Sequence, residues 1–246
     1  MGQQISRRSF LKGGLAAAAG VAATTIPGSE ALAQPDETKQ LATLLDISKC
    51  VGCGECVAAC SEANADKYPD PQNPFPKMYP PRAKVSDWSD KQDVDDRLTP
   101  YNWLFIQNAT VDVNGEETEL TIPRRCMHCV NPPCVKLCPW GAAKQQENGI
   151  SRIDSDLCLG GSKCKKVCPW DIPQRQTGFG LYLDILPSMA GNGVMYKCDR
   201  CYDRVADGEL PACIEACPED VQTIGPRDEI IKKAHDLARE INGYIY

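Results

Sequence analysis

The sequence predicts an α+β fold that is built from small repeated units rather than around one large hydrophobic core. First, the chain has 15 cysteines in 246 residues, and they fall into four runs of closely similar spacing. Second, a short apolar stretch with strand character precedes each run. Third, aromatic residues make up only 7% of the chain, which argues against a single conventional core. One supersecondary unit repeated four times accounts for all three observations.

Each cysteine run combines closely spaced cysteines with a last cysteine three residues after its neighbour. Run one holds Cys50, Cys53, Cys56 and Cys60; run two holds Cys126, Cys129, Cys134 and Cys138; run three holds Cys158, Cys164 and Cys168; run four holds Cys198, Cys201, Cys213 and Cys217. In the bacterial ferredoxin run, three closely spaced thiolates hold one [4Fe–4S] cube, and the fourth, followed by proline, ligates a second cube. All 15 cysteines belong to a run, so the sequence predicts iron–sulfur clusters.

Two other uses of cysteine compete with this interpretation. Pairs of Cys-x-x-Cys also build structural zinc sites, but zinc does not usually need the third cysteine or the trailing Cys-Pro. Exported cysteine-rich chains are often stapled by disulfides. An odd total of 15 would leave one thiol unpaired, and such scaffolds are usually far shorter than 246 residues. Clusters are therefore favoured, and a zinc-stabilised interaction protein stays as an alternative.

Residues 1–33 are predicted to be a twin-arginine signal peptide. Arg7 and Arg8 stand in the receptor-read signature, an apolar run follows at 13–26, and a small-residue cleavage site ends at Ala33. A membrane anchor is the weaker alternative, because a spanning helix needs about 20 apolar residues. Clusters assemble on reduced thiols in the cytoplasm, so the chain must be exported already folded. We expect it on the periplasmic side of a bacterial inner membrane.

Charge and composition exclude several functions. Without the leader the chain has 24 basic and 32 acidic residues, a net charge of −8 that argues against nucleic acid as a partner. No later segment is apolar enough for a direct membrane span after cleavage. The two histidines, His128 and His235, have no plausible catalytic partner, and His128 is expected to tune a neighbouring cluster or only to pack. Basic residues nonetheless gather near the cysteines, where cations would balance the negative clusters: Arg124, Arg125, Lys136, Lys163, Lys165, Lys166, Lys197 and Arg200.

Short strands are expected to enter the four runs, at 43–46, 120–122, 150–153 and 194–196. The insertion at 61–125 has no cysteine, so it is either a partner-docking element or a decorative loop. It is predicted to contain a proline-rich extended loop at 68–81, followed by a charged, exposed stretch at 87–97. Further on, residues 103–106 could pair with residues 118–122 in a hairpin across an Asn-Gly turn.

Two further segments lie on either side of run four, one before it and one after it. The apolar stretch 181–186 could be core or interface. A helix is predicted to begin at Pro226 and to end near Gly243, with Asp228 and Glu229 in its first turn. Its expected apolar stripe consists of Ile230, Ile231, Ala234, Leu237, Ala238 and Ile241.

Four runs, the eleven-residue gap between Cys201 and Cys213, and the twin-arginine leader together resemble the four-cluster iron–sulfur (ferredoxin-type, beta) subunits of respiratory oxidoreductases such as dimethyl sulfoxide reductase, formate dehydrogenase and nitrate reductase. A leader on the subunit itself is more similar to the electron-transfer subunit of hydrogenase-2. The resemblance covers residues 41–241. It implies two pseudo-symmetric double-cluster ferredoxin-like modules: 34–60 with 190–246 carries runs one and four, and 126–189 carries runs two and three.

The resemblance also implies the ligand sets. They are Cys50, Cys53, Cys56 and Cys217 for one [4Fe–4S] cluster; Cys198, Cys201, Cys213 and Cys60 for a second; Cys126, Cys129, Cys134 and Cys168 for a third; and Cys158, Cys164 and Cys138 for the fourth. Gly161 stands where a cysteine is expected, so the fourth cluster should be [3Fe–4S]; it would be [4Fe–4S] if Ser162 or water is a ligand. Ser61 follows Cys60, whereas proline follows the last cysteine of the other runs.

The function that the resemblance implies is electron transfer without catalysis. Such a subunit relays electrons between a catalytic subunit, either a molybdopterin-type oxidoreductase or a hydrogenase, and a quinone-reactive or cytochrome membrane subunit. The alternative is a free soluble polyferredoxin carrier with no fixed partner.

Overall fold

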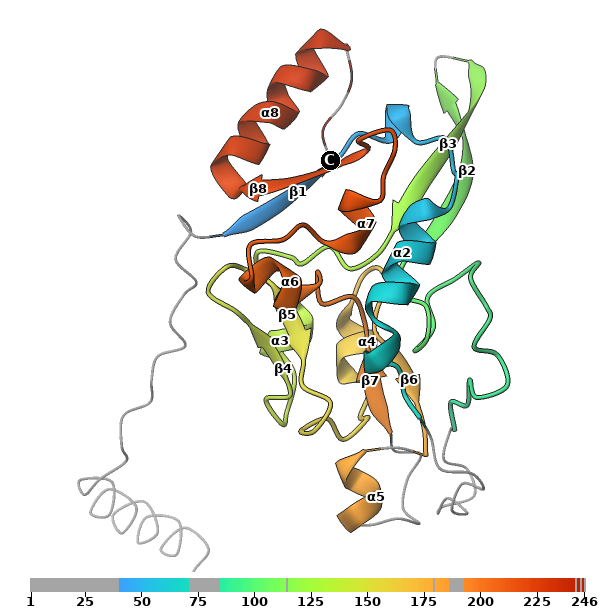
Figure 1. Ribbon diagram of the computed structural model, residues 1–246, viewed down its shortest axis with the longest axis vertical. Helices are drawn as coiled ribbons and strands as arrows, with labels where there is room; N and C mark the ends of the chain where they lie inside the picture. Colours follow the sequence, from blue (N-terminus) through green and yellow to red (C-terminus); the bar gives the residue numbers. More distant parts are fainter. Residues whose placement is uncertain are drawn as a thin grey trace, which may run out of the picture. The chain divides into compact units, whose positions relative to one another are not determined.

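The computed structural model describes residues 40–70, 85–113, 115–178, 180–185, 193–241, 243 and 245. They all belong to one compact unit, residues 35–246 (Figure 1). The predicted leader at 1–33 lies outside the described residues, and so does the predicted proline-rich loop from residue 71 onward.

The described chain contains short helices and short strands, as expected for an α+β protein. In order, the elements are β1 (Leu41–Leu45), η2 (Ile47–Lys49), α2 (Glu55–Ala63), η3 (Ala65–Lys67), β2 (Phe105–Val113), β3 (Glu116–Arg124), α3 (Pro133–Lys136), β4 (Ala143–Gln145), β5 (Ser151–Ile153), α4 (Lys163–Val167), β6 (Gln174–Gln176), α5 (Leu181–Ile185), β7 (Val194–Tyr196), α6 (Tyr202–Ala206), α7 (Ala212–Glu215), β8 (Gln222–Pro226) and α8 (Arg227–Glu240). Within the described residues, the strands form four antiparallel two-stranded sheets: β1–β8, β2–β3, β4–β5 and β6–β7.

The sheet β1–β8 joins the two ends of the described chain (Figure 1). Leu41 pairs with Pro226, and Leu45 pairs with Gln222. Run one follows β1 directly and run four directly precedes β8, so this sheet holds the two runs side by side. Helix α2 of run one accordingly packs against α7 of run four.

The other two small sheets frame runs two and three. Ala143 pairs with Ile153 in β4–β5, which connects the two runs, and helices α3 and α4 of these runs pack together. Gln174 pairs with Tyr196 in β6–β7, which follows run three and leads into run four. A strand is therefore present at all four predicted entry positions, but only β7 has the predicted bounds. The first spans 41–45 and not 43–46, the one before run two is part of the longer strand β3, and β5 begins one residue late, at Ser151.

The predicted hairpin is confirmed, but it begins two residues later than expected. Strands β2 and β3 pair from Phe105 with Arg124 as far as Val113 with Glu116. Trp103 and Leu104 precede β2 because they turn into the protein interior, where Leu104 is fully buried. The indole Nε1 of Trp103 donates a hydrogen bond of 2.8 Å to the carbonyl oxygen of Pro100.

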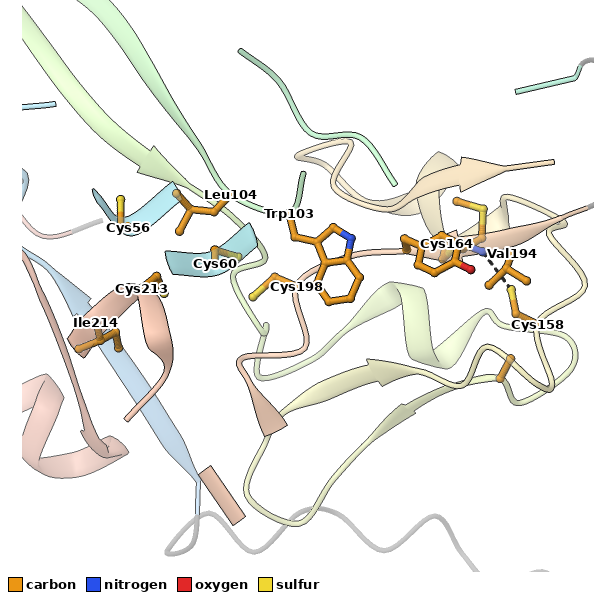
Figure 2. Close-up of a cluster of buried hydrophobic side chains, with 13 residues drawn as sticks. Cys56, Cys60, Trp103, Leu104, Cys158, Cys164, Val194, Cys198, Cys213 and Ile214 are labelled. Atoms are coloured by element: carbon orange, nitrogen blue, oxygen red, sulfur yellow. Dashed lines mark hydrogen bonds between the residues drawn. The ribbon is translucent and has the colours of Figure 1, made fainter. Parts of the chain in front are cut away.

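The hydrophobic core contains the cysteines themselves. Its buried members are Cys56, Cys60, Trp103, Leu104, Ala142, Cys158, Cys164, Val194, Met195, Tyr196, Cys198, Cys213 and Ile214. In Figure 2, Trp103 lies between Cys60 and Cys198 on one side and Cys158 and Cys164 on the other. Its ring stacks on Tyr196, with centroids 6.4 Å apart. Part of the inserted segment 61–125 therefore fills the core.

The C-terminal helix packs on the sheet that joins the chain ends. Helix α8 has Asp228 and Glu229 in its first turn, as predicted. Of its expected apolar stripe, Ile230 and Ala234 are buried, whereas Ile231 is 37% exposed. A sheet of two strands is too narrow to cover the whole stripe. In the part of the chain that the structure describes, no helix has both the length and the apolar character to span a membrane.

The stretch 181–186 and the charged stretch 87–97 behave differently. Residues 181–185 form helix α5, and Ile185 is 59% exposed, so this patch is not core; residue 186 lies outside the described residues. The charged stretch 87–97 is largely exposed, as predicted.

Replacing Gly193 by alanine should destabilise the sheet β6–β7. The backbone there has φ of 130°, and an added methyl group would meet the carbonyl oxygen of Gln176 and lie 2.8 Å from the Cα of Thr177. Such overpacking costs about 1–3 kcal/mol, which lowers the melting temperature by roughly 2–12 °C in a chain of this size. Gly161→Ala is the matched control for thermal unfolding, because a methyl group there meets no atom within 4 Å. Equal melting temperatures for the two variants would contradict the packing argument.

Candidate iron–sulfur cluster sites

All fifteen cysteines of the chain lie in the described residues, and all are free thiols. The disulfide alternative is therefore not realised in this structure. We refer to the four ligand sets that the resemblance implies as sites 1 to 4: site 1 is Cys50, Cys53, Cys56 and Cys217; site 2 is Cys60, Cys198, Cys201 and Cys213; site 3 is Cys126, Cys129, Cys134 and Cys168; site 4 is Cys138, Cys158 and Cys164.

The thiols of site 1 surround one pocket. Its wall includes all four cysteines of the site, together with Ile106, Pro123 and Pro218. Gly52 and Gly54 have φ of 71° and 83°, which lets the loop wind tightly around this space. Burial raises the pKa of Cys56 to about 12, and the thiols of Cys213, Cys217, Cys50 and Cys53 contribute to this rise. Cys217 of run four thus lies among the cysteines of run one.

Site 2 lies deeper in the core. Its four cysteines are each at most 7% exposed. Burial raises the pKa of Cys60 well above its ordinary value, and Cys198, Cys213 and Cys201 add to that effect. Helix α2 continues past Cys60 to Ala63, because the following residue is Ser61 and not proline. The side-chain Nδ2 of Asn64, the next residue, donates a hydrogen bond to the sulfur of Cys60 at 3.8 Å.

Site 3 also surrounds a pocket, and this one is bounded by rigid residues. All four of its cysteines line the wall, as do Pro132, Pro133, Pro169, Trp170 and Lys197. Burial raises the pKa of Cys134; Lys197 opposes this shift, and Cys126 and Cys168 add to it. Cys168 of run three therefore lies among the thiols of run two.

Site 4 has three thiols and one position without a side chain. Burial raises the pKa of Cys164 to about 12, and Cys158, Cys134 and Cys138 contribute to this rise. The backbone N–H of Met195 donates to the sulfur of Cys158 at 3.4 Å (Figure 2, dashed line). The space beside Gly161 is open, since an added Cβ would meet no atom within 4 Å.

Three buried cations lie close to the thiols of sites 2 and 3. Arg125, Lys197 and Arg200 are 4%, 6% and 3% exposed. Burial opposes the charge of Lys197, yet the thiols of Cys126, Cys198 and Cys134 raise its pKa above the ordinary value. For Arg200, burial and the neighbouring Arg125 lower the pKa to about 10. Among the other basic residues predicted near the cysteines, Lys136, Lys163 and Lys166 are exposed, and Arg124 and Lys165 are half-buried.

His128 is buried in the loop of run two, 6% exposed. Burial lowers its pKa well below the ordinary value, and the positive charges of Lys197, Arg200 and Arg125 lower it further. Sequence reasoning placed His128 beside a cluster, but the identity of its neighbours required the structure, because they come from other runs.

These donor sets fit iron–sulfur clusters. Cysteine thiolates are the ligands that such clusters require, and sites 1 and 3 offer pockets with four sulfurs in the wall. Buried cations beside the thiols favour their deprotonated form and the negative charge of a bound cluster. Within the described residues, no three Cys, His, Asp or Glu side chains gather around a single point as ligands of one metal ion do.

Comparison with known families identifies three segments. Residues 49–142 and residues 118–227 each match a 4Fe-4S dicluster domain, so together these matches include all four cysteine runs. Residues 4–24 match the signal sequence of the twin-arginine translocation (TAT) pathway. The predicted export signal is thereby confirmed.

Several curated relatives are named as components of oxidoreductases. Over 203 residues, the sequence is 33% identical to one chain of the anaerobic dimethyl sulfoxide reductase of Escherichia coli K12, which covers 82% of this chain and 80% of the relative. It is 30% identical to the hydrogenase-2 operon protein HybA of E. coli O157:H7, over 94% of this chain and 65% of that protein. For one subunit of the sulfite dehydrogenase of Allochromatium vinosum the identity is 30%, over 83% and 76%. This protein belongs to the family of iron–sulfur electron-transfer subunits that includes these dimethyl sulfoxide reductase and sulfite dehydrogenase components.

Proposed function

We propose that this chain is the non-catalytic electron-transfer subunit of a membrane-associated respiratory oxidoreductase that faces the periplasm. It would relay electrons between a catalytic subunit and a quinone- or cytochrome-linked membrane subunit. One observation carries this proposal: the pockets of sites 1 and 3 are each lined by four thiols that come from two different runs. When bound, iron–sulfur clusters accept and release single electrons.

The cofactor content follows from the donor sets. Sites 1, 2 and 3 each hold a [4Fe–4S] cluster, and site 4 holds a [3Fe–4S] cluster on Cys138, Cys158 and Cys164. Gly161 has no side chain to donate. The hydroxyl of the neighbouring Ser162 already has two partners, the carbonyl oxygen of Gly160 at 3.3 Å and the sulfur of Met195 at 3.4 Å.

The helix contacts support two pseudo-symmetric modules. Residues 34–60 with 190–246 form one module, in which α2 packs on α7; residues 126–189 form the other, in which α3 packs on α4. The inserted hairpin β2–β3 is the docking element for a partner. Residues 116–119 at the start of β3 are all exposed, whereas the opposite end of the hairpin adjoins the core.

The names of the relatives support the partners. They name one chain of a dimethyl sulfoxide reductase, a hydrogenase-2 operon protein and one subunit of a sulfite dehydrogenase, which supports a partnership with a larger oxidoreductase. The proposed partners are a catalytic subunit of the molybdopterin oxidoreductase or hydrogenase type and a separate quinone-reactive or cytochrome membrane subunit. The twin-arginine leader supports a position on the periplasmic side of the inner membrane. Neither a zinc-stabilised protein nor a free polyferredoxin is favoured by a specific observation, because the matched domains bind iron–sulfur clusters and the relatives are named as parts of larger enzymes or as operon partners.

Purification of the protein from native membranes tests the proposed function. We expect brown material with about fifteen iron atoms per chain, from three [4Fe–4S] clusters and one [3Fe–4S] cluster, that co-purifies with a larger catalytic subunit. A pale protein, or a brown protein that is isolated as a stable monomer under mild conditions, would contradict the assignment.

Replacing Gly161 by cysteine should convert site 4. The open space at Gly161 admits the side chain, and a fourth thiolate retains the fourth iron, so the iron content should rise by about one atom per chain. The EPR signal of the oxidised [3Fe–4S] cluster should disappear from spectra of the air-oxidised protein. Gly161→Ala is the control and should keep the signal. An unchanged oxidised spectrum in Gly161→Cys means that site 4 holds no three-iron cluster.

Replacing Cys60 by serine should perturb site 2 and not site 1. Cys60 is close to Cys53 and Cys56 in sequence, but its sulfur lies among Cys198, Cys213 and Cys201. In EPR spectra of the reduced protein, Cys60→Ser should therefore change the same signal as Cys201→Ser. Cys53→Ser should change a different signal. If Cys60→Ser and Cys53→Ser affect one shared signal instead, the pairing of run one with run four is wrong.

Replacing both Arg7 and Arg8 by lysine should block export. The pathway receptor reads the arginine pair itself, so the retained positive charge does not rescue it. Cell fractionation and immunoblotting should show the uncleaved protein in the cytoplasm, with its clusters. Conversion of Lys12 to arginine is the matched control, and periplasmic localisation should persist. Export of the double variant at the wild-type level would refute use of this pathway.

A further inference from the structure

The sulfur of Cys198 has two polar neighbours. The backbone N–H of Arg200, two residues along the same run, donates to it at 3.3 Å. From another run, the imidazole Nε2 of His128 lies 3.8 Å from the same sulfur. His128 belongs to run two, between Cys126 and Cys129 of site 3, whereas Cys198 belongs to site 2. This contact therefore connects the ligand loops of two different sites.

The second ring nitrogen of His128 decides the direction of the hydrogen bond. The backbone N–H of Ser151 donates to Nδ1 at 3.1 Å. A nitrogen that accepts a hydrogen bond carries no proton, so the ring proton is on the other nitrogen, Nε2. Nε2 is thus the donor, and the sulfur of Cys198 is the acceptor.

The backbone conformation of His128 and the contacts of its neighbours support this hydrogen bond to Cys198. His128 has φ of 46°, a left-handed conformation that residues other than glycine seldom adopt and that is found at functional sites. Ser151, whose N–H binds Nδ1, is held in turn by Lys197. The Nζ of Lys197 donates hydrogen bonds to the carbonyl oxygen of Ser151 and, at 3.0 Å, to the carbonyl oxygen of Cys198. One buried lysine therefore holds both the residue that orients the imidazole and the residue that accepts its hydrogen bond.

We propose that His128 is a positioning residue that sets the reduction potential of the cluster at site 2 through its hydrogen bond to Cys198. The inference rests on the proposed function, since it assigns Cys198 to a cluster. Reduction adds negative charge to the cluster and its sulfur ligands, so a donor to a ligand sulfur stabilises the reduced form. The imidazole thereby makes site 2 a better electron acceptor than it would be without this contact.

We connect the contact between His128 and Cys198 with electron transfer between sites 2 and 3. His128 lies in the loop that supplies two thiols of site 3, and its N–H meets a thiol of site 2. The contact of Asn64 with a cysteine sulfur is local, because Asn64 donates to Cys60 four residues away. The contact of His128 with the sulfur of Cys198 instead connects two different runs. The residue thus raises the potential of the site that its own loop approaches.

The test compares three variants of the intact protein by EPR-monitored redox titration. In His128→Leu the donor is lost, and the midpoint potential of the site 2 signal should fall by about 59 mV, which corresponds to a roughly tenfold weaker one-electron reduction. His128→Gln keeps an N–H donor, so its potential should lie closer to that of the wild type. His235→Leu is the matched control, because the only other histidine of the chain is exposed on α8 and no potential should change. The site 2 signal is the one altered by Cys201→Ser.

A second measurement needs no substitution at His128. The chain has two histidines, so growth on ¹⁵N-histidine labels only His128 and His235, provided that no polyhistidine tag is used. Pulsed EPR of the reduced protein should detect ¹⁵N coupled to the site 2 cluster, and the coupling should persist in His235→Leu. This measurement applies even if His128→Leu loses a cluster on purification.

The outcomes separate this inference from the proposed function. A protein without iron and acid-labile sulfide would overturn both. A protein with its full iron content but no ¹⁵N coupling, or with unchanged potentials in His128→Leu, would overturn the role of His128 alone. A shift confined to the site 3 signal would also overturn it, because the hydrogen bond would then act on the wrong ligand.

Discussion

Buried sulfur and the charge that must accompany it are the constraint on which the rest of this structure depends. Six of the thirteen residues in the central hydrophobic cluster are cysteines, and burial raises the pKa values of their thiols. A buried thiolate is costly without a partner. Iron supplies that partner when a cluster binds, and metal binding then contributes directly to folding free energy.

The buried cations follow from the same constraint. Arg125, Lys197 and Arg200 would be poor core residues in an apolar protein, because each one loses its hydration. Here they lie beside thiols of sites 2 and 3, and Arg125 also donates two hydrogen bonds to the side-chain oxygen of Gln222. If clusters bind at these two sites as proposed, positive charge beside them would lower the repulsion between them.

Short strands and long-range pairing keep the loops in place. Each of the three-residue sheets β4–β5 and β6–β7 would be unstable alone. Here β4 also contacts α3, and the three residues of β7, Val194, Met195 and Tyr196, belong to the hydrophobic core. The sheet β1–β8 has the same role for the chain ends, and α8 covers it with Ile230 and Ala234. The inserted segment adds Trp103 to the middle of the core, where its ring stacks on Tyr196.

Local spacing was sufficient to predict the cysteine runs, their entry strands, the hairpin, the C-terminal helix and the leader. These features depend on residues close together in the chain, such as the Asn-Gly sequence before β3 or the acidic residues at the start of α8. Three features were decided only by the tertiary structure: the place of Trp103 in the core, the burial of Arg125, Lys197 and Arg200, and the approach of His128 to Cys198. Each depends on contacts between residues far apart in sequence. No local pattern encodes such contacts, because they form only when the pairing of β1 with β8 and the packing of α2 on α7 bring separate runs together.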